Sequence, residues 1–196
     1  MKVFSWDDIL KNKGCSSLAA DYFARGTALT IGSFDGPHLG HLTLFKEVLN
    51  YAEKNGLISG VVTFRKPLPS FKHASSYMGD ISTLDERLAV FEKLGFDFSL
   101  VIEFDEDFAN IEGGSFFEIL RDSMNLAFLA EGVDFKCGHK GSYGKDQIER
   151  FCLENGLKCS FLPLVKKNGE RISSSKIREL LCADSVEEAN ELLVHE

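Results

Sequence analysis

Basic residues are scarce in this 196-residue sequence, which has 22 Lys and Arg against 30 Asp and Glu and a net charge of −8. This balance argues against general binding to nucleic acid. The sequence also lacks an apolar run of about 18 residues and an apolar leader segment at its start, so we expect no membrane span and a cytoplasmic location. If an acidic protein of this kind binds a phosphate, its donors must be concentrated locally.

Paired cysteines are also missing. The count of five is odd, and no two cysteines form a C-x-x-C motif. Reduced thiols in a cytosolic protein are therefore favoured over a disulfide framework. The cysteines are Cys15, Cys137, Cys152, Cys159 and Cys182.

Strand-like and helix-like segments alternate along the chain, with no internal repeat and no evident linker. This order predicts an α/β fold: a Rossmann-like parallel sheet with helices on both faces, built as a single domain over residues 1–196. Capping boxes are expected at Thr83-x-x-Glu86 and Ser185-x-x-Glu188. Apolar runs predict strands at 28–31, 60–64, 98–102, 126–130 and 159–164, with a short edge strand at 2–4.

The segment from Thr30 to His41 reads as a strand, a glycine-rich turn and the start of a helix. His38 and His41 are three residues apart, which places both imidazoles on one helix face. A helix start offers free N–H groups and the positive end of the helix dipole. An anion, most plausibly a phosphate, is the natural ligand there.

Three other stretches follow predicted strands. They are a cationic loop at 65–72, a flexible glycine-rich loop at 132–144 and a helix start at 172–178 with three serines followed by Lys and Arg. The loop at 65–72 could equally be a solvated loop. Ligands of parallel sheets bind beyond the carboxyl ends of the strands, so we expect all four stretches to meet in one cleft.

The His-x-Gly-His pattern has three possible meanings. Zinc binding needs three or four ligands, and the remaining histidines are only His73, His139 and His195. Two histidines that cap a helix are the second possibility. The third and favoured interpretation is phosphate binding during nucleotidyl transfer, with imidazole donors on an α-phosphate and with Gly40 leaving room for the nucleotide. The acidic run 103–107 lacks ligand spacing and is expected to be a solvated connector, so no metal site is predicted.

At these residues the sequence resembles the HxGH nucleotidyltransferase superfamily. More narrowly, it resembles the FMN adenylyltransferase (FAD synthetase) module of bacterial bifunctional riboflavin kinase/FAD synthetases. Residues 30–41 are similar to T-I-G-N-F-D-G-V-H-L-G-H, and residues 172–178 to I-S-S-T-R-I-R. Residues 61–64 match a V-V-T-F strand, and 132–138 match G-x-[DN]-F-x-F-G. The resemblance extends over about residues 27–194.

The resemblance implies that ATP and FMN react to FAD and pyrophosphate with Mg²⁺, without a general base because the FMN phosphate is already anionic. The implied partners are these small molecules, with no nucleic acid and no membrane. The implied catalytic residues are His38, His41 and Arg178. The implied ATP-binding residues are Gly32, Ser33, Phe34, Gly36, His38, Gly40, His41, Ser173, Ser174, Ser175 and Arg178. The implied flavin-binding residues are Phe64, Arg65, Asp134, Gly138 and Lys140.

The sequence departs from the family pattern at four places. Ser33 stands where Asn is usual, Cys137 stands where Phe is usual, and Arg65-Lys66 replace the start of an Asp/Glu-Pro-His-Pro segment. The sequence ends about where a riboflavin kinase barrel would begin, so no riboflavin kinase domain is expected. Two alternatives stay open: a related enzyme with another phosphate acceptor, such as a pantetheine phosphate or nicotinamide mononucleotide, and a non-catalytic flavin- or nucleotide-binding module.

Overall fold

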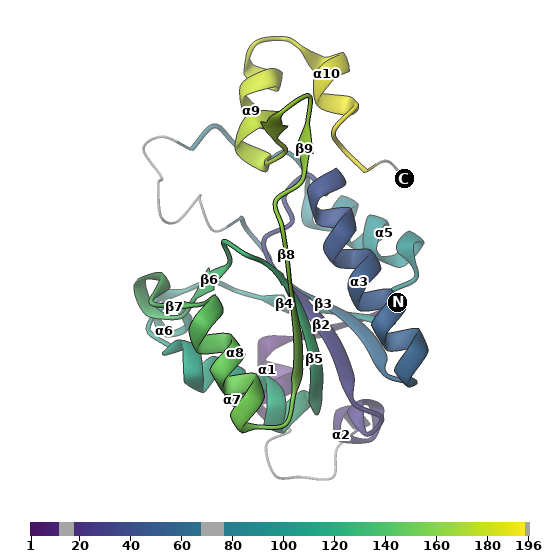
Figure 1. Ribbon diagram of the computed structural model, residues 1–196, viewed down its shortest axis with the longest axis vertical. Helices are drawn as coiled ribbons and strands as arrows, with labels where there is room; N and C mark the ends of the chain where they lie inside the picture. The colour runs from purple at the N-terminus through teal and green to yellow at the C-terminus, as the bar shows by residue number, and fades with distance from the viewer. Residues whose placement is uncertain (12–17, 68–76, 195–196) are drawn as a thin grey trace.

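The computed structural model describes residues 1–11, 18–67 and 77–194. Its centre is a six-stranded sheet in which every neighbouring pair of strands is parallel (Figure 1). In spatial order the strands are β1 (Lys2–Ser5), β4 (Phe98–Ile102), β3 (Ile58–Phe64), β2 (Thr27–Ile31), β5 (Leu126–Gly132) and β8 (Lys158–Leu162). From β2 the chain adds β3 and then β4 on one side, and later β5 and then β8 on the other side. The strand order therefore reverses between β2 and β5. The predicted fold class is confirmed.

Helices cover both faces of this sheet because the strands are apolar on both sides. Alternate residues of β2 enter different cores: Ala28 packs with residues of α3 (Leu39–Asn55) and α5 (Leu84–Leu94). Leu29 and Ile31 pack on the opposite face. That face is covered by α1 (Trp6–Lys11), α2 (Leu18–Phe23), α7 (Gly113–Met124) and α8 (Lys145–Glu154).

Two helix ends have the geometry that their residues favour: the capping box at Thr83-x-x-Glu86, and the Asn55-Gly56 pair, which is typical of a helix C-terminus. The Thr83 hydroxyl and the Glu86 side chain form a capping box at the start of α5, and Gly56 ends α3 in the left-handed conformation with φ 67°. The capping box expected at Ser185 is wrong, because this residue makes no side-chain cap bond to α10 (Val186–Asn190). Its backbone has φ −86° and ψ 56°, which is not the extended conformation that directs a capping hydroxyl to the helix.

Two predicted loops contain short elements. The acidic connector after β4 includes α6 (Glu106–Ala109). The loop expected to be flexible at 132–144 folds into β6 (Lys136–Cys137), the 3₁₀ turn η1 (His139–Gly141) and β7 (Tyr143–Gly144). Gly138 anchors this unit, with φ 72° and a backbone so close to α7 that an added Cβ would lie 2.5 Å from the Gly113 nitrogen.

The C-terminal part of the chain returns to the start of α3. After β8, a hairpin of β9 (Lys166–Lys167) and β10 (Glu170–Arg171) leads to α9 (Ser174–Cys182) and α10, at the yellow end of Figure 1. Residues beyond α10 then form hydrogen bonds with residues 37–39, called the histidine segment below. Leu39 N donates to Leu192 O at 2.9 Å, and Val194 N donates to Pro37 O at 2.7 Å. None of the helices in the described ranges combines the length and apolar character needed to span a bilayer.

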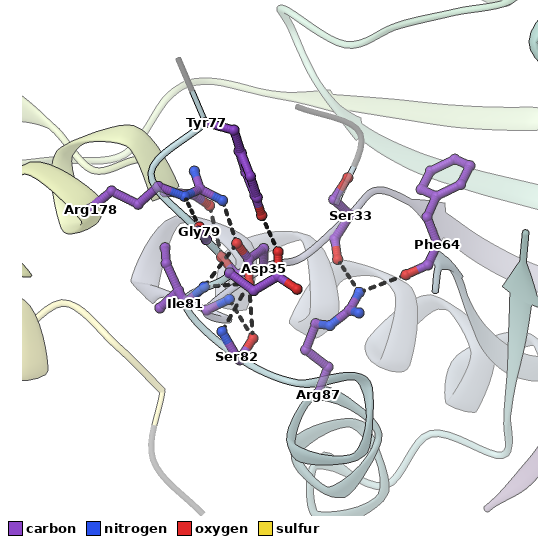
Figure 2. Close-up of polar contacts among 12 residues, drawn as sticks. Ser33, Asp35, Phe64, Tyr77, Gly79, Ile81, Ser82, Arg87 and Arg178 are labelled. Carbon is purple, nitrogen blue, oxygen red and sulfur yellow. Dashed lines mark hydrogen bonds and ion pairs between the residues drawn. The ribbon is translucent and has the colours of Figure 1, made fainter. Parts of the chain in front are cut away.

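A buried arginine fixes the carboxyl ends of the central strands. Arg87 on α5 is 1% exposed, and its guanidinium donates to the carbonyl oxygens of Ser33 (2.7 Å) and Phe64 (2.9 Å) (Figure 2). It also donates to the Arg65 carbonyl oxygen at 2.9 Å. The helical spacing predicts an apolar face of Leu84, Leu88 and Phe91, but the buried positions of α5 are Arg87, Val90 and Phe91. A charged arginine therefore occupies one of the buried positions of this helix.

We expect Arg87→Met to lower the free energy of unfolding by about 3–5 kcal/mol, because it leaves several buried carbonyl groups without their donor. Lys93→Met on the exposed side of α5 is the matched control and should change the free energy by about 0.5 kcal/mol at most. Urea unfolding of both variants measures the difference. Equal stability of the two variants would contradict the role given to Arg87.

Candidate functional site

Two cavities adjoin each other at the carboxyl ends of the central strands. The first, of about 310 Å³, contains His38 and His41 in its wall and is called the histidine cavity below. The second, of about 410 Å³, is lined by five phenylalanine rings and is called the aromatic cavity. Ile31, Gly32 and Phe135 line both. The cavities therefore meet beside the strand-order reversal, where ligands of open α/β sheets bind.

The two histidines stack on each other at the start of α3. Their ring centroids are 3.6 Å apart with an interplanar angle of 16°. His38 is the N-cap residue, and its Nδ1 accepts a hydrogen bond from the His41 backbone N–H at 3.3 Å. Because Nδ1 is an acceptor here, the neutral His38 ring carries its proton on Nε2. Among the described residues, the buried Nδ1 of His41 has no hydrogen-bond partner.

Both imidazoles are neutral at neutral pH. Burial lowers the pKa of His38 from 6.5 to about 4, and the nearby Arg171 acts in the same direction. Burial also lowers the pKa of His41 well below its ordinary value, and His38 contributes to that shift. Two stacked imidazolium ions would repel each other, so the neutral state agrees with the geometry. The pair can therefore offer N–H donors to a ligand, but no net charge.

A buried carboxylate holds the turn before the histidines (Figure 2). Asp35 is 2% exposed and accepts from the backbone N–H groups of Ile81 and Ser82, each at 3.0 Å. It also forms a buried ion pair with Arg178 of α9, whose Nε donates to Gly79 O at 2.9 Å. These contacts bring the turn, segment 79–82 and α9 together.

The start of α9 forms the other side of the histidine cavity. Ser173 is its N-cap, and the Ser173 hydroxyl accepts from Lys176 N at 3.2 Å. The Ser174 hydroxyl donates to Asp35 O at 2.8 Å, which ties α9 directly to the turn. The N-termini of α3 and α9 thus border one cavity, and two positive helix ends favour an anion.

The histidine cavity collects nearly all residues predicted to bind ATP. Gly36 is the exception: it lies outside this cavity, with φ 60°, and an added Cβ would lie 2.5 Å from Ile81 Cγ2, so its place in the turn requires glycine. The predicted residues that line the cavity are Gly32, Ser33, Phe34, His38, Gly40, His41, Ser173, Ser174, Ser175 and Arg178.

The residues predicted to bind flavin are divided. Phe64, Gly138 and Lys140 line the aromatic cavity, whereas Asp134 lines the histidine cavity and pairs with Arg171. Arg65 lines neither cavity, and its exposed side chain pairs with Glu103.

Three of the four predicted stretches therefore meet in the histidine cavity. From the fourth, Pro67 also lines it, and residues 68–72 lie outside the described residues. Within the described ranges, no group of three or more His, Cys, Asp or Glu side chains is arranged to hold a metal ion.

Three buried ionisable side chains at this site were missed by the sequence analysis: Asp35, Arg87 and Glu131. Asp35 lies within the predicted segment 30–41 but was given no role. No sequence pattern indicated the burial of Arg87, because an arginine between leucines on a helix is normally exposed. A weak pattern indicated the burial of Glu131, which is the single acidic residue in the apolar run of β5. It is 1% exposed, lines the histidine cavity and accepts from Ile31 N at 2.6 Å.

We expect the contribution of His38 to stability to fall with pH below 6.5. The unfolded chain protonates His38 near pH 6.5 but the folded chain only near pH 4, so this contribution is complete above pH 6.5 and decreases toward pH 4. Between pH 7 and 5 the loss due to His38 is about 2 kcal/mol. His38→Asn keeps a cap acceptor but does not titrate, so the pH dependence of urea unfolding should become weaker by that amount. An unchanged pH dependence would contradict the neutral buried state of His38.

We expect Asp35→Asn and Arg178→Met each to lower the free energy of unfolding by about 3 kcal/mol or more, because each leaves a buried polar group without its partner. The double variant should cost at least about 1 kcal/mol less than the sum of the two. The exposed pair of Arg65 and Glu103 is the matched control, with an expected coupling below about 1 kcal/mol. Urea unfolding of both mutant cycles provides the test, and equal coupling in both would refute a special role for the buried pair.

Comparison with known proteins agrees with this geometry. The family model for FAD synthetase matches residues 21–176. A bifunctional riboflavin kinase/FMN adenylyltransferase of Escherichia coli K12 is 30% identical over 172 residues, which cover 87% of this chain and 55% of that protein. An FAD synthetase of Listeria monocytogenes is 26% identical over 179 residues, covering 91% of this chain and 73% of that protein. The chain thus spans about half the length of the bifunctional relatives it matches.

A solved structure shares the fold. The crystal structure of a protein described as a macrolide-efflux protein from Streptococcus pneumoniae superposes with a TM-score of 0.80 at 23% identity, over 98% of this chain and 61% of that chain. At this identity the likeness concerns the fold alone. The family model is the stronger finding, because it runs from before β2 into the start of α9 and so contains both helix starts of the histidine cavity. This chain belongs to the FAD synthetase family.

Proposed function

We propose that this chain transfers AMP from MgATP to FMN, giving FAD and pyrophosphate. One observation carries the proposal: a cavity bordered by two helix N-termini adjoins a cavity lined by aromatic rings, and both share Ile31 and Gly32. A reaction that joins a nucleotide to a flavin needs two such cavities side by side. Membership of the FAD synthetase family supports the same activity.

ATP fits the histidine cavity. Its phosphates would lie between the starts of α3 and α9, where backbone N–H groups and the hydroxyl donors of Ser173 and Ser175 are available. The Ser174 hydroxyl lines the same cavity but already donates to Asp35 O. His38 Nε2–H would donate to the α-phosphate, and His41 would lie beside it. Arg178 contributes its positive charge at the β- and γ-phosphates while it remains paired with Asp35.

FMN fits the aromatic cavity. The rings that line it belong to Phe64, Phe104, Phe108, Phe116 and Phe135, and they provide a large apolar surface for a planar isoalloxazine. Gly138 and Lys140 lie on the same wall. Such a lining favours a flavin over the flexible polar chain of a pantetheine phosphate.

The chemistry follows from the junction of the cavities. A phosphate oxygen of FMN attacks the α-phosphorus of ATP; a new O–P bond forms, and the bond to the bridging oxygen breaks, leaving its electron pair on pyrophosphate. The attacking oxygen is already anionic, so the protein needs no general base. Its tasks are to align the two phosphates and to stabilise the developing charge with fixed donors. Mg²⁺ arrives with ATP as part of the substrate.

We expect the purified protein to convert FMN and MgATP into FAD and pyrophosphate, which chromatography of the flavins and a pyrophosphate assay detect. Nicotinamide mononucleotide and a pantetheine phosphate should not replace FMN, because the aromatic cavity suits a planar tricyclic ring. Binding of FMN and ATP without any FAD would refute the transferase and favour a binding module. Turnover of another acceptor in preference to FMN would refute the assignment of the acceptor.

We expect His41→Ala to lower kcat by about 100-fold or more while the Kd for ATP changes only a few-fold, because donors on developing charge act mainly in the transition state. Lys46→Ala on the exposed side of α3 is the control and should keep the wild-type kcat. Steady-state kinetics and calorimetry with ATP separate the two effects. A parallel loss of ATP affinity and rate would assign His41 to binding alone.

A further inference from the structure

The strands β2 and β5 separate before either of them ends. Their pairing stops at Leu29 and Leu129, whereas β2 stays paired with β3 as far as Ile31 and β5 stays paired with β8 as far as Gly132. The last residues of two neighbouring strands therefore diverge at the reversal of strand order. This divergence leaves the N–H of Ile31 without a backbone acceptor on β5.

The Glu131 side chain fills the gap. Its Oε1 accepts from the Ile31 N–H at 2.6 Å, and the residue is 1% exposed. This bond uses only one of the two carboxyl oxygens, so the bond alone does not account for the whole group. In the described part of the chain no basic side chain pairs with Glu131.

Burial favours the neutral form of this carboxyl. Burial raises the pKa of Glu131 well above its usual value, although the bond from Ile31 acts in the opposite direction. A protonated carboxyl has both an accepting oxygen and a hydroxyl donor. With the accepting oxygen directed at Ile31, the hydroxyl is left as a donor for the histidine cavity, which Glu131 lines.

The position of Glu131 identifies the ligand group that it can reach. Glu131 lines the histidine cavity, and its partner Ile31 lines both cavities. An ionised carboxylate there would repel phosphate, whereas a neutral one donates to it. In the proposed reaction, the phosphate of FMN must pass from the aromatic cavity to the α-phosphate at this junction.

We propose that Glu131 is a specificity-determining residue whose carboxyl, held by the Ile31 amide, donates a hydrogen bond to the phosphate of FMN. This inference rests on the proposed function. Glu131 thereby distinguishes phosphorylated from unphosphorylated flavin, since riboflavin has the same ring system but no phosphate.

The test compares FMN and riboflavin binding to the wild type, Glu131→Gln and Glu131→Met by titration of flavin fluorescence. Met removes donor and acceptor, so FMN affinity should fall about 10- to 100-fold while riboflavin affinity changes less than about 3-fold. Gln keeps both functions and should keep the wild-type ratio of the two affinities within about 3-fold. Because the expected loss is in binding, the KM for FMN should rise more than kcat falls.

If the role of Glu131 is purely structural, Glu131→Met should lower the affinities for FMN and riboflavin by the same factor. That result would overturn the inference. An unchanged FMN affinity would overturn it too. If Glu131→Met does not fold, Glu131→Ala takes its place, because the smaller side chain leaves room for a water molecule beside the Ile31 N–H. Wild-type protein that binds FMN but makes no FAD would refute the proposed function while the affinity ratios still decide the role of Glu131. Wild-type protein that does not bind FMN would refute both.

Discussion

The site depends on the complete pairing of one buried charge. A carboxylate at 2% exposure has lost its hydration, so it is stable only where protein groups replace the water. Asp35 obtains these groups from segment 79–82 and from Arg178 of α9, parts of the chain that lie more than 40 residues away in sequence. The contacts that stabilise this single charge therefore determine where α9 lies relative to the turn before His38. The histidine cavity is the space that remains between them.

An acidic protein can bind phosphate in this way because its donors do not depend on net charge. The two histidines are neutral, and the helix starts at His38 and Ser173 contribute backbone N–H groups and dipoles. At the junction of the cavities burial favours the uncharged form of Glu131 as well. The guanidinium groups of Arg171 and Arg178, which line the histidine cavity, are already neutralised in part by Asp134 and Asp35. Affinity at such a site depends on hydrogen-bond donors that are held in fixed directions. The same fixed donors can also stabilise the charge that develops in a transition state.

The sequence was sufficient to predict the sheet, several helix ends and the histidine cavity, because these follow from local patterns. Apolar runs identify strands, Thr83 and Gly56 mark helix ends, and His38 and His41 are neighbours on one helix turn. The buried partners of Arg87, Asp35 and Glu131 were not predictable. Each is selected by a contact between segments remote in sequence, and no periodicity records such a pair. The same limit explains Ser185, where the correct residue types occur but the backbone entering α10 turns the hydroxyl away.

The hydrogen bonds between the histidine segment and residues 192–194 have a consequence for ligand binding. They join the first turn of α3 to a short segment beyond α10 by backbone bonds at Leu39 and Val194, and His38 itself lies in the bridge to Leu193. If a nucleotide requires His38 in this position, its binding must oppose the release of that segment. Thermodynamic reciprocity then requires that release of the segment lower the affinity for the nucleotide by the same factor. If the histidine cavity binds the nucleotide as proposed, the last described residues of the chain belong energetically to that site, although none of them lines the cavity.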